Sequence, residues 1–403
     1  MAKASCTQEW IEAFVYVDVN ARNIPISNGR AEYTVRRIAL GARHAFTVLT
    51  SNDFVDSGGG GSVSSEFFWP SNPRWQFLPG RDTLPPGIVL PTGECSDGSG
   101  GDTDAGTDRA ALVAFYNTTG GANWTNRTNW LSDAPVGQWH GVTTDASGRV
   151  TELDIEENGL TGPIPPELAM LSDLTHLSLW GNGLTGNIPA WVGPLSNLEV
   201  LWLADNQLTG QIPADLARLT NLTHLNLSDN ELTEGPIPVW LGSLANLEQL
   251  NLASTSCTGT IPSELTDLTN LTYLSLGNNQ LDGTIPSQLG NLSNMGRLYL
   301  TSNQLTGPIP SELGNLSNLE RLALDTNQLE GAIPSQLGML IGLEQLWLHN
   351  NRLTGNIPAE LGDLVNLTII RLAGNQLTGC VPLGLQRVAE NDFDDLGLPF
   401  CSQ

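Results

Sequence analysis

Four acidic residues, Glu152, Asp154, Glu156 and Glu157, stand close together at the start of a long repetitive segment. Paired carboxylates are the groups that glycoside hydrolysis uses, one as the proton donor and the other as nucleophile or base. A row of near-identical segments, however, presents an open surface without a cleft. The simpler interpretation is a solvated acidic end, and we expect that the chain is not an enzyme.

The histidines do not predict a metal site. His176 and His224 occupy equivalent positions two segments apart, so about 10 Å would separate them along a sheet. That separation is too large for both rings to bind one metal ion. The sequence indicates no Ser-His-Asp or Cys-His arrangement and predicts no cofactor.

The acidic charge is concentrated in one part of the chain. The 403 residues carry a net charge of −25, and residues 98–403 hold 32 acidic and 9 basic residues, against 10 and 8 in residues 1–97. Such a surface repels a phosphate backbone, so nucleic acid is excluded as a partner. No apolar segment reaches the roughly 18 residues of a membrane span, which argues against membrane insertion. Adaptation to salt and a docking face for a basic partner both remain open as explanations.

The strongest pattern begins at Val150, where the sequence repeats every 24 residues in about ten copies. In each Leu-x-Leu the leucines point inward and the intervening residue points outward, as in a strand. Thr-Gly turns the chain, Ile-Pro is expected to form a second extended segment, and Leu-Gly-x-Leu a 3₁₀ or helical turn. An inward asparagine that bonds the backbone of neighbouring copies recurs at nine positions: 158, 182, 206, 230, 279, 303, 327, 351 and 375.

Composition divides the chain into five parts. Residues 1–95 predict a β-rich domain, with strands near 14–19, 31–35 and 45–49, and residues 96–106 predict a flexible acidic linker. Residues 107–149 predict a cap that opens on a helix, with Thr107 as its N-cap and Asp108 favoured by the helix dipole. Residues 150–379 are the repeats, and residues 380–403 a C-terminal cap.

The motif Leu-x-x-Leu-x-Leu-x-x-Asn-x-Leu-Thr-Gly-x-Ile-Pro resembles the plant-type leucine-rich repeat. That subclass occurs in receptor-kinase ectodomains, polygalacturonase-inhibiting proteins and some bacterial surface proteins. The resemblance covers about 150–385 and implies an α/β solenoid, a right-handed superhelix with a parallel sheet on its concave face. Residues 108–142 are similar to the family's N-terminal cap but lack its paired cysteines. The resemblance implies an extracellular or cell-surface binding module, although the first residues show no signal peptide.

The five cysteines fit this organisation. Cys380 and Cys401 bracket the divergent last segment, and a disulfide between them would fasten the C-terminal cap in an oxidising compartment. Cys6 and Cys95 lie at the two ends of the first domain, and the sequence leaves their pairing open. Cys257 replaces a core leucine, so we expect a buried, unreactive thiol.

The outward strand positions vary among the copies while the core positions hardly change, which predicts a binding face. Exposed aromatic and arginine side chains dominate the energetics of many interfaces. We expect a monomer that binds a protein or a glycan there, whereas Trp191 and Trp240 pack between repeats on the outer side. The predicted ligand-binding residues are His176, Trp180, Trp202, His224, Tyr273, Arg297, Tyr299, Arg321, Trp347, His349 and Arg371.

Two alternatives are surface adsorption, as in ice-binding solenoids, and a structural adhesin spacer. A regular column of threonines could present a flat lattice, although Asp282 and Glu330 interrupt it and threonine is also an ordinary turn residue. The column consists of Thr161, Thr185, Thr209, Thr233, Thr258, Thr306, Thr354 and Thr378.

Overall fold

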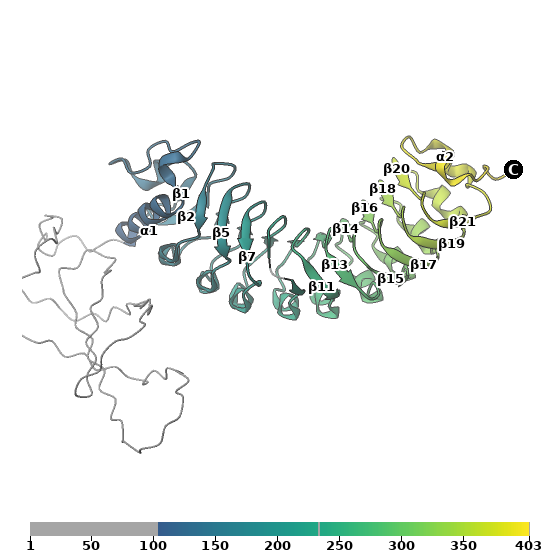
Figure 1. The fold of residues 1–403 in the computed structure, drawn as a ribbon, viewed down its shortest axis with the longest axis horizontal. Helices are drawn as coiled ribbons and strands as arrows, with labels where there is room; N and C mark the ends of the chain where they lie inside the picture. The colour runs from purple at the N-terminus through teal and green to yellow at the C-terminus, as the bar shows by residue number, and fades with distance from the viewer. Residues whose placement is uncertain (1–103, 233, 403) are drawn as a thin grey trace, which may run out of the picture. The chain divides into compact units, whose positions relative to one another are not determined.

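A computed structural model describes residues 104–232 and 234–402 of the chain (Figure 1). These residues form an arc of stacked coils, with one coil for each 24-residue repeat. The predicted domain 1–95, including Cys6 and Cys95, lies outside the described residues. Among the described helices, none is both long and apolar enough to cross a membrane.

An eleven-stranded sheet lines the inner side of the arc and confirms the predicted parallel sheet. Ten strands are parallel and aligned residue by residue, as in the pairing of Leu250 with Leu274, and β1 joins β2 in the antiparallel sense. The strands, in order, are β1 Val142–Thr144, β2 Val150–Asp154, β4 His176–Ser178, β6 Val200–Trp202, β8 His224–Asn226, β10 Gln249–Asn251, β12 Tyr273–Ser275, β14 Arg297–Tyr299, β16 Arg321–Ala323, β18 Gln345–Trp347 and β20 Ile369–Arg371.

Leucines of successive coils fill the space between the inner sheet and the outer turns. Leu177, Leu201 and Leu250 are fully buried, and each pairs in register with a leucine of the next coil. Because a strand alternates its side chains, burial of these leucines turns their neighbours toward the open inner face. We call this surface the concave face; it comprises the outward strand residues and the second residue beyond each strand.

The inward asparagines hold each coil to the one before it, as predicted. The Nδ2 group of Asn206 donates to the backbone oxygens of Leu203 and Ala204 in its own coil and of Leu179 in the preceding coil, at 2.9–3.2 Å. Its Oδ1 accepts the backbone N–H of Leu184 at 3.0 Å. Equivalent sets recur at the later asparagines, so the register of the sheet is fixed by buried hydrogen bonds.

Thr255 stands at the one coil position that lacks the asparagine. Its hydroxyl donates to the backbone oxygen of Leu252 at 2.6 Å, and its N–H donates to Oδ1 of Asn279. The shorter threonine side chain makes a hydrogen bond within its own coil, but it does not bond the preceding coil as an asparagine does. The extra residue Glu234 falls in that preceding coil.

The outer side differs from the prediction in one respect. Thr-Gly, which was expected to turn the chain, lies in the second strand of most coils, and the extended Ile-Pro follows that strand and leads into a 3₁₀ turn. Proline lacks the N–H that a ladder needs, so it serves better as the residue before a helical turn. The outer strands are β3 Thr161–Pro163, β5 Gly183–Asn187 and β7 Gln207–Thr209; β9 Gly235–Pro236, β11 Cys257–Thr260 and β13 Gln280–Asp282; and β15 Thr306–Pro308, β17 Gln328–Ala332, β19 Arg352–Asn356 and β21 Gln376–Thr378, in three separate sheets.

One 3₁₀ turn per coil covers the outer side, and Trp191 and Trp240 pack partly buried against the core there, as expected. The turns are η3 Pro166–Met170, η4 Ala190–Val192, η5 Ala214–Arg218, η6 Val239–Ser243, η7 Ser263–Asp267, η8 Ser287–Asn291, η9 Ser311–Asn315, η10 Ser335–Met339, η11 Ala359–Asp363 and η12 Leu383–Arg387.

The N-terminal cap opens on helix α1, Asp104–Thr118, which starts before the predicted N-cap Thr107 and takes in residues 104–106 of the predicted linker. The dipole argument placed Asp108 in the first turn of the helix, but it is the fifth residue of α1. It is fully buried and accepts hydrogen bonds from Nε of Arg149 at 2.9 Å and from the backbone N–H of Val150 at 2.8 Å. The start of the sheet is thereby fastened to the helix.

Aromatic side chains fill the rest of this cap, around the turns η1 Gly121–Asn123 and η2 Val136–Gln138. The rings of Trp124 and Trp130 meet edge to face, with centroids 4.8 Å apart, and Trp139 packs 5.0 Å from Trp130. The guanidinium of Arg109 lies 4.8 Å from the centre of the Trp139 ring. These three tryptophans are structural.

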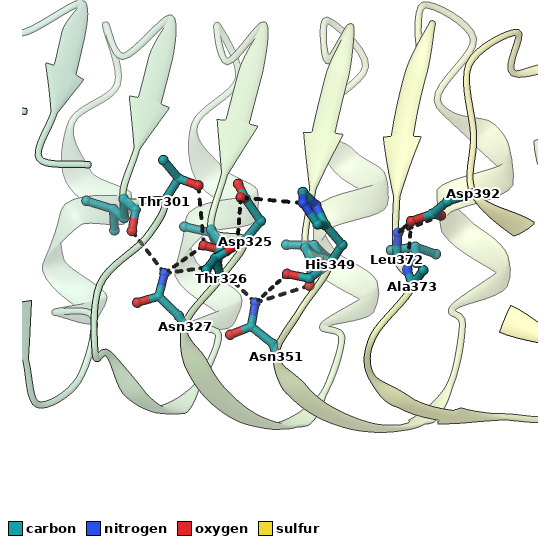
Figure 2. Close-up of polar contacts among 12 residues, drawn as sticks. Thr301, Asp325, Thr326, Asn327, His349, Asn351, Leu372, Ala373 and Asp392 are labelled. Carbon is teal, nitrogen blue, oxygen red and sulfur yellow. Dashed lines mark hydrogen bonds and ion pairs between the residues drawn. The ribbon is translucent and has the colours of Figure 1, made fainter. Parts of the chain in front are cut away.

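The C-terminal cap contains the predicted disulfide between Cys380 and Cys401 and the short helix α2, Phe393–Leu396. Asp392 replaces the missing next coil, since its carboxylate accepts the backbone N–H groups of Leu372 and Ala373 at 2.8–2.9 Å (Figure 2). Glu390 continues the inner sheet by one residue, because its backbone oxygen accepts the N–H of Ile370 at 2.9 Å.

Cys257 is buried and unpaired, as the sequence predicted. Burial raises the pKa of its thiol, and a hydrogen bond with Thr255 opposes this only in part. The folded state therefore favours the protonated thiol. Its contribution to stability is complete at pH values below the ordinary pKa of cysteine, and it is lost as the pH rises through the higher pKa of the folded state.

We therefore expect Cys257 to resist a thiol reagent in the native protein at about pH 8. In the native state, wild-type protein and Cys257→Ala should incorporate the same number of labels per chain. After unfolding in urea, the wild type should incorporate one label more than the variant. A native difference between the two proteins would show that the thiol is accessible.

Candidate binding site on the concave face

The structure places all eleven predicted residues on the concave face. Nine lie on strands of the inner sheet, and Trp180 and His349 lie two residues beyond β4 and β18. Trp202 and Arg297 are exposed, and the other nine are half-buried against their neighbours. The structure gathers eight of them into two hollows and a group between the hollows, while His176, Trp180 and His224 stay apart from both hollows and from that group.

The N-terminal end of the face carries the acidic cluster. Glu156 accepts a hydrogen bond from the Ser178 hydroxyl, and partial burial together with Glu156 raises the pKa of Asp154. The Nδ1 atoms of His176 and His224 each lie 2.8 Å from the hydroxyl of the threonine before them. Neither hollow reaches these groups.

A group of tyrosines and arginines occupies the middle of the face, on β12, β14 and β16. The rings of Tyr273 and Tyr299 lie 5.6 Å apart and are tilted by 53°. Hydrogen bonding to Tyr299 raises the pKa of the Arg321 guanidinium, and burial raises the pKa of Tyr273. Nε of Arg297 lies 3.7 Å from the carboxylate of Glu320. The Tyr273 phenol therefore stays protonated at neutral pH.

The central hollow, of about 180 Å³, is lined by Trp202, Leu225, Asn226, Gln249, Asn251 and Tyr273. Its floor is made of amide side chains held in place by the backbone: Oδ1 of Asn226 accepts the N–H of Ser228, and Oδ1 of Asn251 accepts the N–H of Ala253, both at 3.1 Å. Two aromatic side chains thus stand beside fixed amide groups, an arrangement that suits apolar contact together with hydrogen bonding.

The C-terminal hollow is larger, about 330 Å³, and is lined by Thr301, Asp325, Trp347, His349, Ile369, Arg371 and Glu390. Trp347 lies between Ala323 and Arg371 of the neighbouring strands. Figure 2 shows Asp325 and His349 pointing toward each other from adjacent coils, and Nε2 of His349 lies 3.6 Å from Oδ2 of Asp325. Nη2 of Arg371 lies 3.7 Å from Glu390, so the C-terminal cap closes one side of this hollow.

Sequence reasoning missed several residues that complete the hollows. The 24-residue spacing does place Asn226, Asn251 and Asp325 at outward positions, but their residue types gave no reason to choose them over others. Glu390 had no such signal because it lies in the cap, where the repeat has ended. Its position follows only from the bridge between the cap and β20.

Comparison with known proteins gives the same class as the fold. Models of the leucine-rich repeat match residues 149–283, described as a leucine-rich repeat region, as well as residues 269–329 and 342–364. A plant ice-binding protein of known structure is 30% identical, with a TM-score of 0.64 over 74% of this chain and 98% of that protein. The chain belongs to the leucine-rich-repeat family. A comparison with curated proteins found no match.

Plant receptor ectodomains are also similar. The ectodomain of the Arabidopsis thaliana receptor kinase GASSHO1/SCHENGEN3, solved with CASPARIAN STRIP INTEGRITY FACTOR 2, is 41% identical with a TM-score of 0.58, over 59% of this chain and 29% of that one. The Arabidopsis receptor kinase HAESA, solved with an IDA peptide hormone, is 32% identical with a TM-score of 0.60, over 72% of this chain and 52% of that one. The chain thus spans about half or less of the length of these two receptors.

Proposed function

We propose that this chain is an extracellular or cell-surface binding module, acting as a monomer, that recognises a protein ligand on its concave face. The observation that carries the proposal is the gathering of aromatic and charged side chains around two hollows on one face. These side chains point away from the leucine core, so packing of the core does not explain their presence. The receptor ectodomains solved with peptides support a protein ligand over other classes.

The spacing of the hollows fits an extended peptide segment. Trp202 on β6 and Trp347 on β18 are separated by six strand spacings, about 29 Å along the sheet. An extended chain rises about 3.4 Å per residue, so about nine residues would reach from one tryptophan to the other. The amide floor of the central hollow can hydrogen-bond a peptide backbone, while the tryptophans and tyrosines contact its side chains.

A displayed library of extracellular proteins and random peptides tests this proposal. Ligands selected on the full chain should bind a Trp202→Ala/Trp347→Ala variant at least tenfold more weakly, because the variant loses both aromatic anchors. The matched control is Ile341→Ala/Val365→Ala, which removes two exposed apolar side chains outside both hollows and should bind normally. Ligands that bind both variants equally would place the site elsewhere.

A glycan array run with the same proteins separates the other ligand class. If a glycan binds the wild-type protein but not the Trp202→Ala/Trp347→Ala variant, the ligand of the concave face is a glycan and not a protein. Absence of binding in both screens would favour the spacer function over recognition.

Ice binding is the second candidate, because the match between this chain and the plant ice-binding protein extends over 98% of that protein. Threonines of the outer column are exposed at positions including Thr185, Thr306 and Thr354. The exposed carboxylates of Asp282 and Glu330 interrupt this column, and the outer strands form three separate sheets. Inhibition of ice recrystallisation that is lost in Thr185→Lys/Thr354→Lys, and kept in Trp202→Ala/Trp347→Ala, would establish this alternative.

A further inference from the structure

The C-terminal hollow contains two buried polar atoms without a hydrogen-bond partner, Oδ1 of Asp325 and Nδ1 of His349. Asp325 is only 8% exposed, and both residues line the hollow. A buried carboxylate oxygen that lacks a hydrogen-bond donor is unfavourable, because it has lost its water partners and gained none in the protein. The hollow is therefore incomplete until a ligand supplies the missing groups.

The remaining contacts of Asp325 and His349 indicate which groups are missing. Oδ2 of Asp325 accepts a hydrogen bond from the Thr326 hydroxyl at 3.3 Å and lies 3.6 Å from Nε2 of His349 (Figure 2). The His349 tautomer that places its proton on Nε2, facing that carboxylate, has Nδ1 as an acceptor. Both unpartnered atoms are acceptors in this arrangement, so the ligand must supply hydrogen-bond donors.

The charges around the hollow favour a cation. Arg371 and Glu390 lie 3.7 Å apart at the cap side and offset each other, which leaves the Asp325 carboxylate as the net charge of the hollow. The indole of Trp347 forms part of the wall and can stack on a planar cation. An anion would meet two carboxylates. The surplus of acidic residues in 98–403 further attracts a basic partner.

We infer that the C-terminal hollow receives an arginine side chain of the bound protein, an inference that rests on the proposed function. The guanidinium is planar, carries five N–H donors and stacks on aromatic rings, so it can satisfy Asp325 and His349 while it lies against Trp347. A lysine ammonium supplies donors but cannot stack in this way. A sugar ring supplies hydroxyl donors without the positive charge.

Calorimetric titration of the full chain with Nα-acetyl-arginine amide tests this inference. Its neutral isostere Nα-acetyl-citrulline amide, Nα-acetyl-lysine amide and a panel of monosaccharides are titrated beside it. We expect the arginine compound to bind at least tenfold more tightly than the citrulline compound. Asp325→Asn should weaken arginine binding at least tenfold, and the matched control Asp282→Asn, an exposed carboxylate on the outer strand β13, should leave it unchanged.

Three results would overturn the inference: equal binding of arginine and citrulline, arginine binding that Asp325→Asn leaves unchanged, or binding of a monosaccharide in place of arginine. Thermal unfolding of Asp325→Asn confirms that the variant is folded before it is titrated. A selected protein ligand that is lost in Trp202→Ala/Trp347→Ala but unaffected by Asp325→Asn would leave the proposed function standing and remove only the arginine site.

Discussion

Replacing Asp108 with alanine is expected to lower the free energy of unfolding by about 3–5 kcal/mol. The carboxylate is fully buried and accepts hydrogen bonds from Nε and Nη2 of Arg149 and from the N–H of Val150. Alanine leaves the Val150 N–H without its acceptor and removes the buried partner of the guanidinium. Urea unfolding followed by circular dichroism measures the change.

Two further variants make the Asp108 prediction specific. Asp108→Asn keeps an acceptor oxygen and should lose less stability than the alanine variant. Asp133→Ala removes an exposed carboxylate of the same cap and should change the free energy of unfolding by less than about 0.5 kcal/mol. An Asp108→Ala protein as stable as Asp133→Ala would show that the cap does not depend on the buried pair.

The second large effect is expected for Asn279→Ala, about 3–5 kcal/mol, because several buried groups lose their partners together. Nδ2 of Asn279 donates to the backbone oxygens of Leu252, Leu276 and Gly277 at 2.7–3.1 Å. Its Oδ1 accepts the N–H groups of Thr255 and Cys257 at 3.1 and 2.9 Å. This residue therefore joins the coil that lacks an asparagine to the coil that follows it.

A solenoid is stabilised by contacts between neighbouring coils, so the loss in Asn279→Ala should be local at first. Hydrogen exchange should speed up most at the amides of 249–260 and 273–282, ahead of the terminal coils. The matched control is Asn294→Ala, an exposed asparagine whose single hydrogen bond to the Thr269 oxygen should be worth about 1 kcal/mol. Uniform exchange along the solenoid in Asn279→Ala would contradict this account.

The repeated part of the fold could be predicted almost completely, because about ten copies of the repeat can be compared at every position. The leucines, the asparagines and the replacement of a leucine by Cys257 all follow from comparing one copy with the next. The prediction of a turn at Thr-Gly was wrong, because spacing alone does not say which residues of an extended segment pair with the neighbouring coil. Backbone hydrogen bonding decides that, and it places the outer strand at Thr-Gly, just before Ile-Pro.

The caps could be predicted only in outline, since they have no second copy for comparison. Asp108 carries a buried carboxylate and Asp392 a half-buried one, and each replaces a missing neighbouring coil, yet both look in the sequence like ordinary charged surface residues. In the candidate site, the spacing placed Trp347 and His349 on the correct face. The pairing of His349 with Asp325, and the closing of the hollow by Glu390, depend on side-chain conformations and on the cap.

The most direct test of concave-face recognition is hydroxyl-radical footprinting of the full chain with and without a selected protein ligand. Our account predicts protection of Trp202, Tyr273, Tyr299 and Trp347, with Met339 and Ile341, which lie outside both hollows, modified equally in the two states. Protection of Met339 and Ile341, with the four aromatic residues unchanged, would contradict it and place the binding surface elsewhere on the solenoid.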